Sequence, residues 1–206
     1  AAGISSRAPH IVGISDRPPH LVDLSAVPHC GGFIATIIGT PGDDFIIGTN
    51  GPAVILGLAG HDHIEGNGGD DIICAGDGDD LVDGNDGDDE LWGDADDDTI
   101  FGGEGEDRIL GNGGNDWISG GPGMDDIDGN NGNDTIFGDG GDDWISGGYG
   151  NDWISGGPGA DSLDGNEDDD FVSGGNGADE IYGGPGNDEL EGNGGDDFID
   201  GETGHD

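Results

Sequence analysis

The chain has 206 residues, of which 50 are Gly, 48 are Asp or Glu and three are Lys or Arg, so its formal net charge is −45 at pH 7. This acidity excludes nucleic acid as a partner, because binding to a phosphate backbone depends on Lys and Arg. No apolar run is long enough for membrane insertion, and the length fits one domain with an appendage.

Residues 1–29 are the first distinct segment, and they carry two of the three basic residues, Arg7 and Arg17. Residues 4–12 and 14–22 share one pattern, Ile-Ser-x-Arg-x-Pro-His-x-Val. Short β-prone stretches separated by proline are typical of extended edge segments rather than helices. We therefore expect residues 1–29 to form an extended β-prone arm, followed by a second unit over residues 30–206.

From Gly39 the sequence repeats every nine residues, with 18 complete nonapeptides up to Asp200 and a nineteenth that stops at its sixth residue. Gly, Asn and Asp dominate positions 1, 2 and 4, and these residues enter left-handed backbone conformations at low cost, which predicts a tight turn. Position 8 is Ile, Leu or Val in every complete repeat. This predicts a short strand at positions 7 to 9 whose middle side chain points inward. Turn and strand, repeated, predict a solenoid.

Position 6 is Asp in 18 of the 19 repeats, with Ala53 as the exception. One carboxylate per repeat, beside a glycine loop with exposed carbonyl groups, is an oxygen-only ligand set. Such a set suits Ca²⁺, a hard cation, whereas zinc and copper prefer His or Cys. The alternative is that Asp-Gly turns merely close the strands, but 18 Asp at one position exceed what turns need. The pattern therefore indicates that the chain binds multiple calcium ions.

The repeat resembles the RTX nonapeptide, GGxGxDxUx, and the resemblance covers residues 39–206. It implies an all-β protein, a parallel β-roll (β-helix solenoid) of about nine turns with two nonapeptides per turn. Calcium would lie between stacked loops, held by position-6 carboxylates and main-chain carbonyl groups. Ala53 would leave one neighbouring site weak or empty. The metal ligands implied by position are Asp44, Asp62, Asp71, Asp80, Asp89, Asp98, Asp107, Asp116, Asp125, Asp134, Asp143, Asp152, Asp161, Asp170, Asp179, Asp188, Asp197 and Asp206.

The first turns are apolar on their outward positions, which include Phe45, Ile47 and Ile72, and the arm is the expected cover. Cys74 is outward at position 9, and Cys30 lies where the roll begins. We expect a Cys30–Cys74 disulfide that pins the arm, with an intermolecular disulfide as the alternative. Two cysteines also favour an oxidising compartment.

Odd-numbered and even-numbered repeats are expected on opposite faces of the roll. The odd face carries outward aromatic residues interleaved with Ser and Thr, namely Phe101, Trp117, Phe137, Trp153 and Phe171. Aromatic residues on one uncharged face predict a contact surface, with cross-strand stacking that stiffens the sheet as the alternative. Residues 201–206 are still in register, so either the chain is cut there or the open end meets another subunit.

The sequence contains no HExxH or GxSxG motif, and we expect no enzymatic activity. We expect a secreted protein, extracellular or at the cell surface, that folds on binding calcium because the ions offset carboxylate repulsion. Its expected role is structural, through head-to-tail self-association of a homopolymer into filaments or matrix. The alternative is a calcium-binding repeat module cut from a larger secreted enzyme, toxin or adhesin.

Overall fold

The computed structural model describes residues 28–206, so the expected arm lies outside the described residues except for Pro28 and His29. Residues 28–206 form strands and turns and no helix. Accordingly, this part of the chain offers no helix that could cross a membrane.

Twenty-three strands make up the described chain, and β5 to β18 and β21 have six residues each. Their bounds are β1 (His29–Cys30), β2 (Phe33–Ile34), β3 (Ile37–Ile38), β4 (Phe45–Ile47), β5 (Val54–Ala59), β6 (His63–Gly68), β7 (Ile72–Asp77), β8 (Leu81–Asp86), β9 (Glu90–Ala95), β10 (Thr99–Glu104), β11 (Arg108–Gly113), β12 (Trp117–Pro122), β13 (Asp126–Asn131), β14 (Thr135–Gly140), β15 (Trp144–Tyr149), β16 (Trp153–Pro158), β17 (Ser162–Glu167), β18 (Phe171–Asn176), β19 (Glu180–Tyr182), β20 (Pro185–Gly186), β21 (Glu189–Gly194), β22 (Phe198–Asp200) and β23 (Thr203–Gly204).

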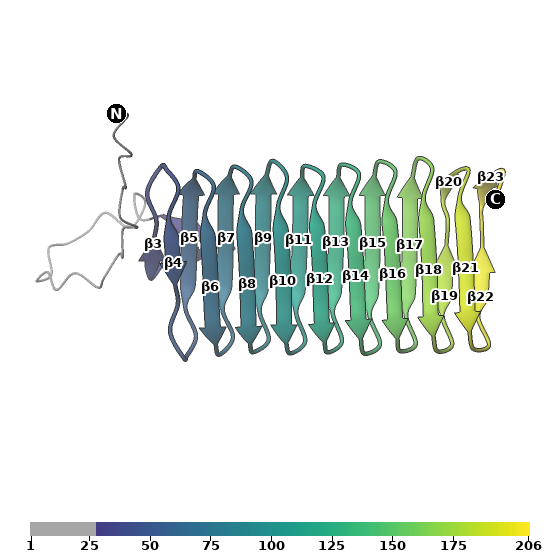
Figure 1. The fold of residues 1–206 in the computed structure, drawn as a ribbon, viewed down its shortest axis with the longest axis horizontal. Coiled ribbons are helices and arrows are strands. Elements are labelled where there is room, and N and C mark those ends of the chain that lie inside the picture. Colours follow the sequence, from purple (N-terminus) through teal and green to yellow (C-terminus); the bar gives the residue numbers. More distant parts are fainter. Residues whose placement is uncertain (1–27) are drawn as a thin grey trace, which may run out of the picture.

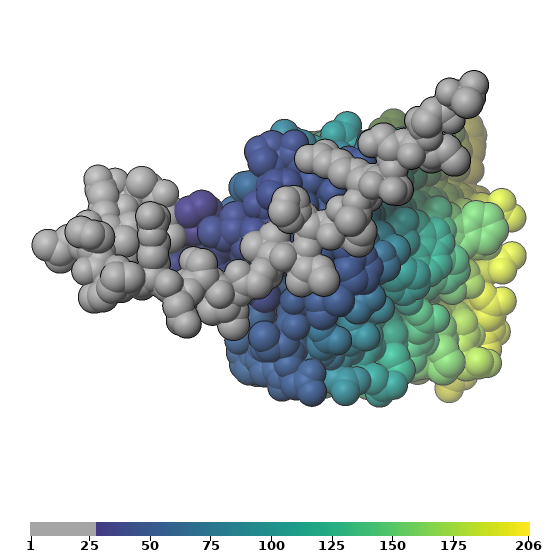
Figure 2. Space-filling view, turned by 60° about the vertical axis from the view of Figure 1, so that its left-hand side comes forward, coloured from purple at the N-terminus to yellow at the C-terminus, as the bar shows by residue number. Residues whose placement is uncertain are grey.

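Two parallel sheets build the roll (Figure 1), and consecutive nonapeptides alternate between them. The nine-stranded sheet has the order β21-β18-β16-β14-β12-β10-β8-β6-β4, and the ten-stranded sheet has the order β22-β19-β17-β15-β13-β11-β9-β7-β5-β3. Paired residues are 18 positions apart, as in Ile100↔Ile118 and Ile109↔Ile127. The expected parallel β-roll, an all-β solenoid of about nine turns with two nonapeptides per turn, is confirmed. The space-filling view shows the turns following one another in colour order along the rod (Figure 2).

The strands are longer than the three residues expected, because they continue from position 7 of one repeat to position 3 of the next. Position 2 is left-handed, with φ of 74° at Asn112 and 73° at Asn130, yet the two residues remain paired across neighbouring strands. The left-handed residue therefore bends the strand without ending it. The turn proper occupies only positions 4 to 6.

The core consists of the position-8 side chains, which form one column on each sheet and point inward as predicted. From Ile55 to Ile181 these side chains are 0–1% exposed. In the last turns the column opens, because Leu190 is only partly buried and Ile199 is 45% exposed. Two facing rows of aliphatic residues thus fill the interior and leave no space for larger side chains.

A hairpin covers the first turns on one side only. Strands β1 and β2 pair antiparallel around Gly31 and Gly32, and a Cβ added to Gly31 would lie 2.9 Å from the Trp92 ring. A disulfide joins Cys30 to Cys74 with their Cα atoms 5.7 Å apart. This contact covers the ten-stranded sheet. On the nine-stranded sheet Ile47 remains 52% exposed in the described chain, so the described residues do not supply the complete cover that was expected.

Candidate calcium-binding loops

The position-6 aspartates lie in the loops that connect the two sheets, one in each loop except that of Ala53. Asp44 and those from Asp62 to Asp188 are at most 8% exposed, whereas Asp197 and Asp206 in the last turn are not buried. Fully buried carboxylates are rare unless a counter-charge or hydrogen bonds compensate them. The loops therefore need a compensating partner for each carboxylate.

From Asp62 onward, one oxygen of each carboxylate is compensated by a hydrogen bond from the preceding turn. Asp98 N–H donates to Asp116 Oδ1 at 2.8 Å, and Asp116 N–H donates to Asp134 Oδ1 at 2.8 Å. The bond recurs in 17 pairs, from Asp44–Asp62 to Asp188–Asp206, with N···O distances of 2.7–3.3 Å. We call this series the inner ladder. It makes each aspartate a structural link as well as a candidate ligand.

The other oxygen, Oδ2, has no partner in 15 of these aspartates and is shielded from solvent. They are Asp62, Asp71, Asp80, Asp89, Asp98, Asp107, Asp116, Asp125, Asp134, Asp143, Asp152, Asp161, Asp170, Asp179 and Asp188. At Asp44 the same atom accepts the N–H of Thr40 instead. A buried carboxylate oxygen without a partner is costly, and a cation is the partner that suits it.

The orphaned oxygens border a small space beside each position-1 glycine. A Cβ added to Gly111 would meet Asp116 Oδ2 and would lie 2.9 Å from the carbonyl oxygen of Gly129 on the next turn. Gly111 is thus required for space rather than for a left-handed conformation, which corrects the expectation from sequence. A carboxylate oxygen and a main-chain carbonyl oxygen face the same space, and both are ligands that calcium accepts.

Burial raises the pKa of the inner-ladder carboxyl groups from Asp62 to Asp170. For Asp116 burial is the largest cause, the hydrogen bond from Asp98 N–H opposes it, and the charges of Asp134 and Asp97 add to it, which brings the pKa to about 7. The pKa of Asp98 rises for the same reasons to about 8. Without a cation, the folded loops therefore disfavour the charged form of these groups near neutral pH.

The donor set consists of oxygen atoms alone. In residues 28–206 no three His, Cys, Asp or Glu side chains converge as a metal cluster, so an ion at these loops would need main-chain carbonyl oxygens besides Oδ2. That combination fits a hard cation and not a thiolate- or imidazole-seeking metal. The residues present therefore fit calcium, with the position-6 aspartates as its anionic ligands.

The loop of Ala53 departs from the series in a specific way. By register, an aspartate at residue 53 would accept the N–H of Ala35. That N–H donates instead to the carbonyl oxygen of Pro28 at 3.1 Å. A protein contact thus replaces the missing carboxylate at the beginning of the roll, and a weak or empty calcium site there remains a prediction.

A second series at position 5 was not anticipated from the sequence. Here the side-chain oxygen accepts the N–H of the position-5 residue one turn later. In the inner ladder the side-chain oxygen accepts an N–H from one turn earlier, so the two series of hydrogen bonds run in opposite directions. Asn115 N–H donates to Asp97 Oδ1 at 2.7 Å, and Asn133 N–H donates to Asn115 Oδ1 at 2.9 Å. We call this series the outer ladder. The signal was available, because position 5 is Asp or Asn in 12 of the 19 repeats.

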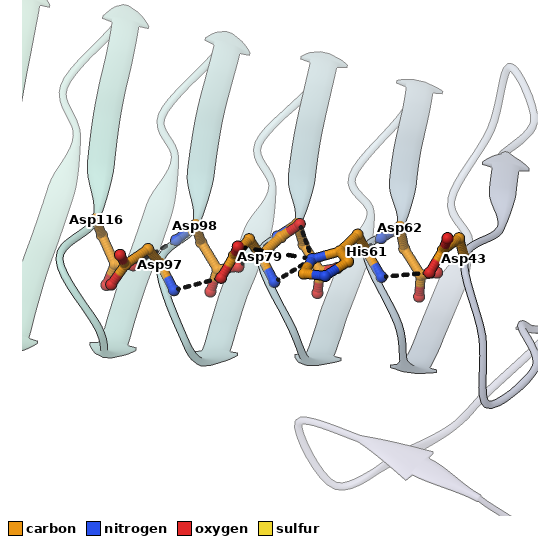
Figure 3. Close-up of polar contacts among 8 residues, drawn as sticks. Asp43, His61, Asp62, Asp79, Asp97, Asp98 and Asp116 are labelled. Carbon is orange, nitrogen blue, oxygen red and sulfur yellow. Dashed lines mark hydrogen bonds and ion pairs between the residues drawn. The ribbon is translucent and has the colours of Figure 1, made fainter.

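Figure 3 shows both ladders side by side, with Asp43, His61, Asp79 and Asp97 in the outer row and Asp62, Asp98 and Asp116 in the inner row. His61 replaces the usual carboxylate or amide, and its Nδ1 accepts the N–H of Asp79 at 2.9 Å. The outer side chains are exposed. The outer ladder therefore fixes the loops from the solvent side while the inner ladder holds the carboxylates for calcium.

The aromatic residues named from sequence lie on the nine-stranded sheet. The ring centroids of Phe101 and Trp117 are 5.0 Å apart, those of Trp117 and Phe137 are 5.5 Å apart, and those of Trp153 and Phe171 are 4.5 Å apart. These rings stack across strands, while Trp117 and Trp153 remain 37% and 52% exposed. Mutual stacking thus leaves part of the aromatic surface open to solvent.

A family model described as the RTX calcium-binding nonapeptide repeat (4 copies) matches the chain in overlapping segments. They are residues 31–51, 47–82, 75–109, 83–118, 101–136, 119–152, 137–172, 146–181 and 173–206. Together they span residues 31–206 without a gap. No curated protein gives a significant match to the chain.

Proposed function

This chain belongs to the RTX calcium-binding nonapeptide repeat family, and we propose that it is a secreted protein that folds on binding calcium and serves a structural role. In this proposal the calcium-loaded rods assemble end to end into extracellular filaments or matrix. No catalytic activity is assigned to the chain. Calcium binding by the β-roll is the premise, and the folding transition, secretion and assembly are the proposal.

Folding on calcium rests on one observation, the 15 buried Oδ2 atoms without a partner. They belong to a chain with a formal charge of −45 and three basic residues. When bound, calcium supplies positive charge at these oxygens. The position-6 aspartates orient the carboxylates through the inner ladder, and the glycines at position 1 keep space beside them. Since the ligands from successive turns meet only in the folded roll, binding and folding are coupled.

The structural role is supported by the shape and uniformity of the roll. A rod of about nine turns at about 4.8 Å per turn is roughly 43 Å long. Phe33 and Ile34 in the first hairpin, and Phe198 and Ile199 in the last turn, are 45–55% exposed. In this proposal, copies contact one another through the exposed apolar side chains of the first hairpin and of the last described turn, which are unlike surfaces.

Secretion is supported by the family, whose members are typically secreted, and by the Cys30–Cys74 disulfide. Disulfides persist in oxidising compartments such as the extracellular space. Calcium concentrations that fill weak modular sites are also found there. Identification of the chain in culture medium, with both cysteines oxidised, would check this part of the proposal.

The first test combines circular dichroism, light scattering and negative-stain microscopy in millimolar calcium and in chelator. We expect a disordered spectrum in chelator and calcium-dependent fibres with an axial repeat near one roll length. An ordered metal-free chain would refute folding on binding. A folded but monodisperse monomer in calcium would refute self-assembly and favour a repeat module cut from a larger secreted enzyme, toxin or adhesin.

A further inference from the structure

The outer face of the nine-stranded sheet carries one aromatic residue on each of β10, β12, β14, β16 and β18. We call Phe101, Trp117, Phe137, Trp153 and Phe171 the aromatic stripe. Three ring contacts with centroids 4.5–5.5 Å apart hold its members in place. Trp117 and Trp153 keep 37% and 52% of their surface exposed. The stripe is therefore an ordered aromatic surface that faces solvent.

Carboxylates border the stripe: Asp83 pairs with Phe101 and Glu189 pairs with Phe171 on the neighbouring strands, and the Ser119 hydroxyl donates to Asp139 Oδ2. On each strand of the stripe the second outward residue of positions 7 and 9 is hydroxyl-bearing, namely Thr99, Ser119, Thr135, Ser155 and Ser173. Over the same span the ten-stranded sheet presents charged outward residues, among them Arg108 and Asp126, which form an ion pair at 3.0 Å. A ligand of the stripe therefore meets aromatic rings and hydroxyl groups, with carboxylates at the border that disfavour an anionic ligand.

A depression adjoins the end of the stripe at Phe101. It has a volume of about 270 Å³ and is lined by Asp83, Asn85, Asp86, Phe101, Gly103, Glu104, Ser119, Gly121 and Pro122. This is slightly smaller than the roughly 300–1,000 Å³ of pockets that hold drug-sized molecules. Its lining combines an aromatic ring and a proline with three carboxylate side chains. Carboxylates only accept hydrogen bonds, so a suitable ligand has an apolar face and several hydroxyl donors.

We propose that this face binds a neutral polysaccharide that lies along the rod. A pyranose ring has a C–H face that stacks on aromatic rings and hydroxyl groups that donate to carboxylates. An apolar protein or lipid surface would leave those carboxylates without partners, which is costly. The strand register Trp117↔Thr135↔Trp153 places the two tryptophans two turns apart, about 10 Å. Two sugar rings of an extended β-1,4-linked chain span a similar length.

The chain contains a matched control for this proposal. Trp117, Trp144 and Trp153 each begin the same pentapeptide, Trp-Ile-Ser-Gly-Gly, at position 7. Trp144 is 63% exposed, but it lies on the ten-stranded sheet between Asp126 and Ser162. Replacing any of the three removes an outward side chain and leaves the position-8 core unchanged. The three variants are therefore matched in sequence context and repeat position, and they differ in the face that they alter and in the ring contacts that Trp117 and Trp153 make within the stripe.

The test is isothermal titration of the full chain in calcium with the hexasaccharides of β-1,4-linked glucose and β-1,4-linked N-acetylglucosamine. At least one is expected to bind, with affinity about tenfold lower in Trp117→Ala and in Trp153→Ala, by analogy with the loss of one aromatic stacking contact. Trp144→Ala is expected to bind like the unaltered chain. Circular dichroism in calcium verifies that each variant is folded.

A second readout does not depend on any variant. Binding of the saccharide is expected to protect the tryptophan emission of the unaltered chain from quenching by acrylamide. Absence of binding by both saccharides, or an equal loss in Trp144→Ala, would overturn the proposal. It would also be overturned if the stripe variants changed only the self-association of the protein. Because these measurements need only the folded roll, they stand apart from the outcome of the filament experiment.

Discussion

Replacement of Asp116 separates the two roles of an inner-ladder aspartate. In Asp116→Ala the N–H of Asp98 loses its acceptor, now at 2.8 Å, in a loop that is buried. A buried donor without a partner costs about 1–3 kcal/mol, and a carboxylate ligand is lost as well. Asp116→Asn retains an oxygen for the ladder and removes only the charge. In calcium we therefore expect Asp116→Ala to be less stable than Asp116→Asn by about 1–3 kcal/mol.

The assay is urea unfolding at a fixed millimolar calcium concentration, followed by far-ultraviolet circular dichroism, with linear extrapolation of the free energy of unfolding. Asp97→Ala is the control, because it removes an outer-ladder acceptor of Asn115 N–H that is open to solvent. Its cost should be smaller, since water replaces the lost bond. Equal stabilities for Asp116→Ala and Asp116→Asn would refute the inner ladder as a source of stability. A calcium midpoint unchanged in both variants would refute Asp116 as a ligand.

Three further predictions concern the loops, the pH and the disulfide. Gly141→Ala should abolish calcium-induced folding, because Gly141 has φ of +148° and the added Cβ would overlap the carbonyl oxygen of Gly123. The control is Gly140→Ala, whose added Cβ would meet no atom within 4 Å. This control should fold normally in calcium, as measured by circular dichroism. In chelator, acidification should favour the ordered state. The pKa values of the buried aspartates in the folded chain are about 6 to 8, above the ordinary value of 3.8. Protonation of these groups therefore contributes fully to stability below about pH 4, and this contribution is lost as the pH rises through 6 to 8. A metal-free chain more ordered at pH 8 than at pH 4 would contradict it. Cys74→Ser should destabilise the hairpin by about 4 kcal/mol, on the chain-entropy estimate for a sequence separation of 44. The loss should appear as faster hydrogen exchange in residues 29–38. Unchanged exchange there would argue against this prediction.

The period of nine determined most of the fold. Every repeat position has the same environment in every turn, so one preference, such as the aliphatic residue at position 8, is stated 18 times in the sequence. Repetition averages out local ambiguity, which is why the solenoid and its inward column could be predicted. The same holds for the position-6 aspartates, whose residue type and single register indicated calcium before any contact was known.

The contacts between turns were decided by the tertiary structure alone. The inner ladder links Asp98 to Asp116 and the outer ladder links Asp97 to Asn115, each over 18 residues and in opposite directions. Sequence shows that these residues are polar, but the direction of a hydrogen bond depends on how successive loops stack. The distinction between Oδ1, which is bonded, and Oδ2, which is free for an ion, arises in the same way.

For the faces and the ends of the rod, the sequence determined one part and the tertiary structure the other. The sequence by itself determined which residues alternate between faces, because the parity of the repeat assigns Trp117 and Trp144 to different sheets. Only the tertiary structure decided that the strands extend through the left-handed position 2. It also decided that the first hairpin packs on Trp92 and that Ile47 stays exposed in the described chain. Which aromatic rings contact one another was likewise decided by the stacked turns. The physical reason is that a periodic sequence specifies the environment of each residue type, whereas packing between side chains on successive turns depends on distances that only the stacked roll sets.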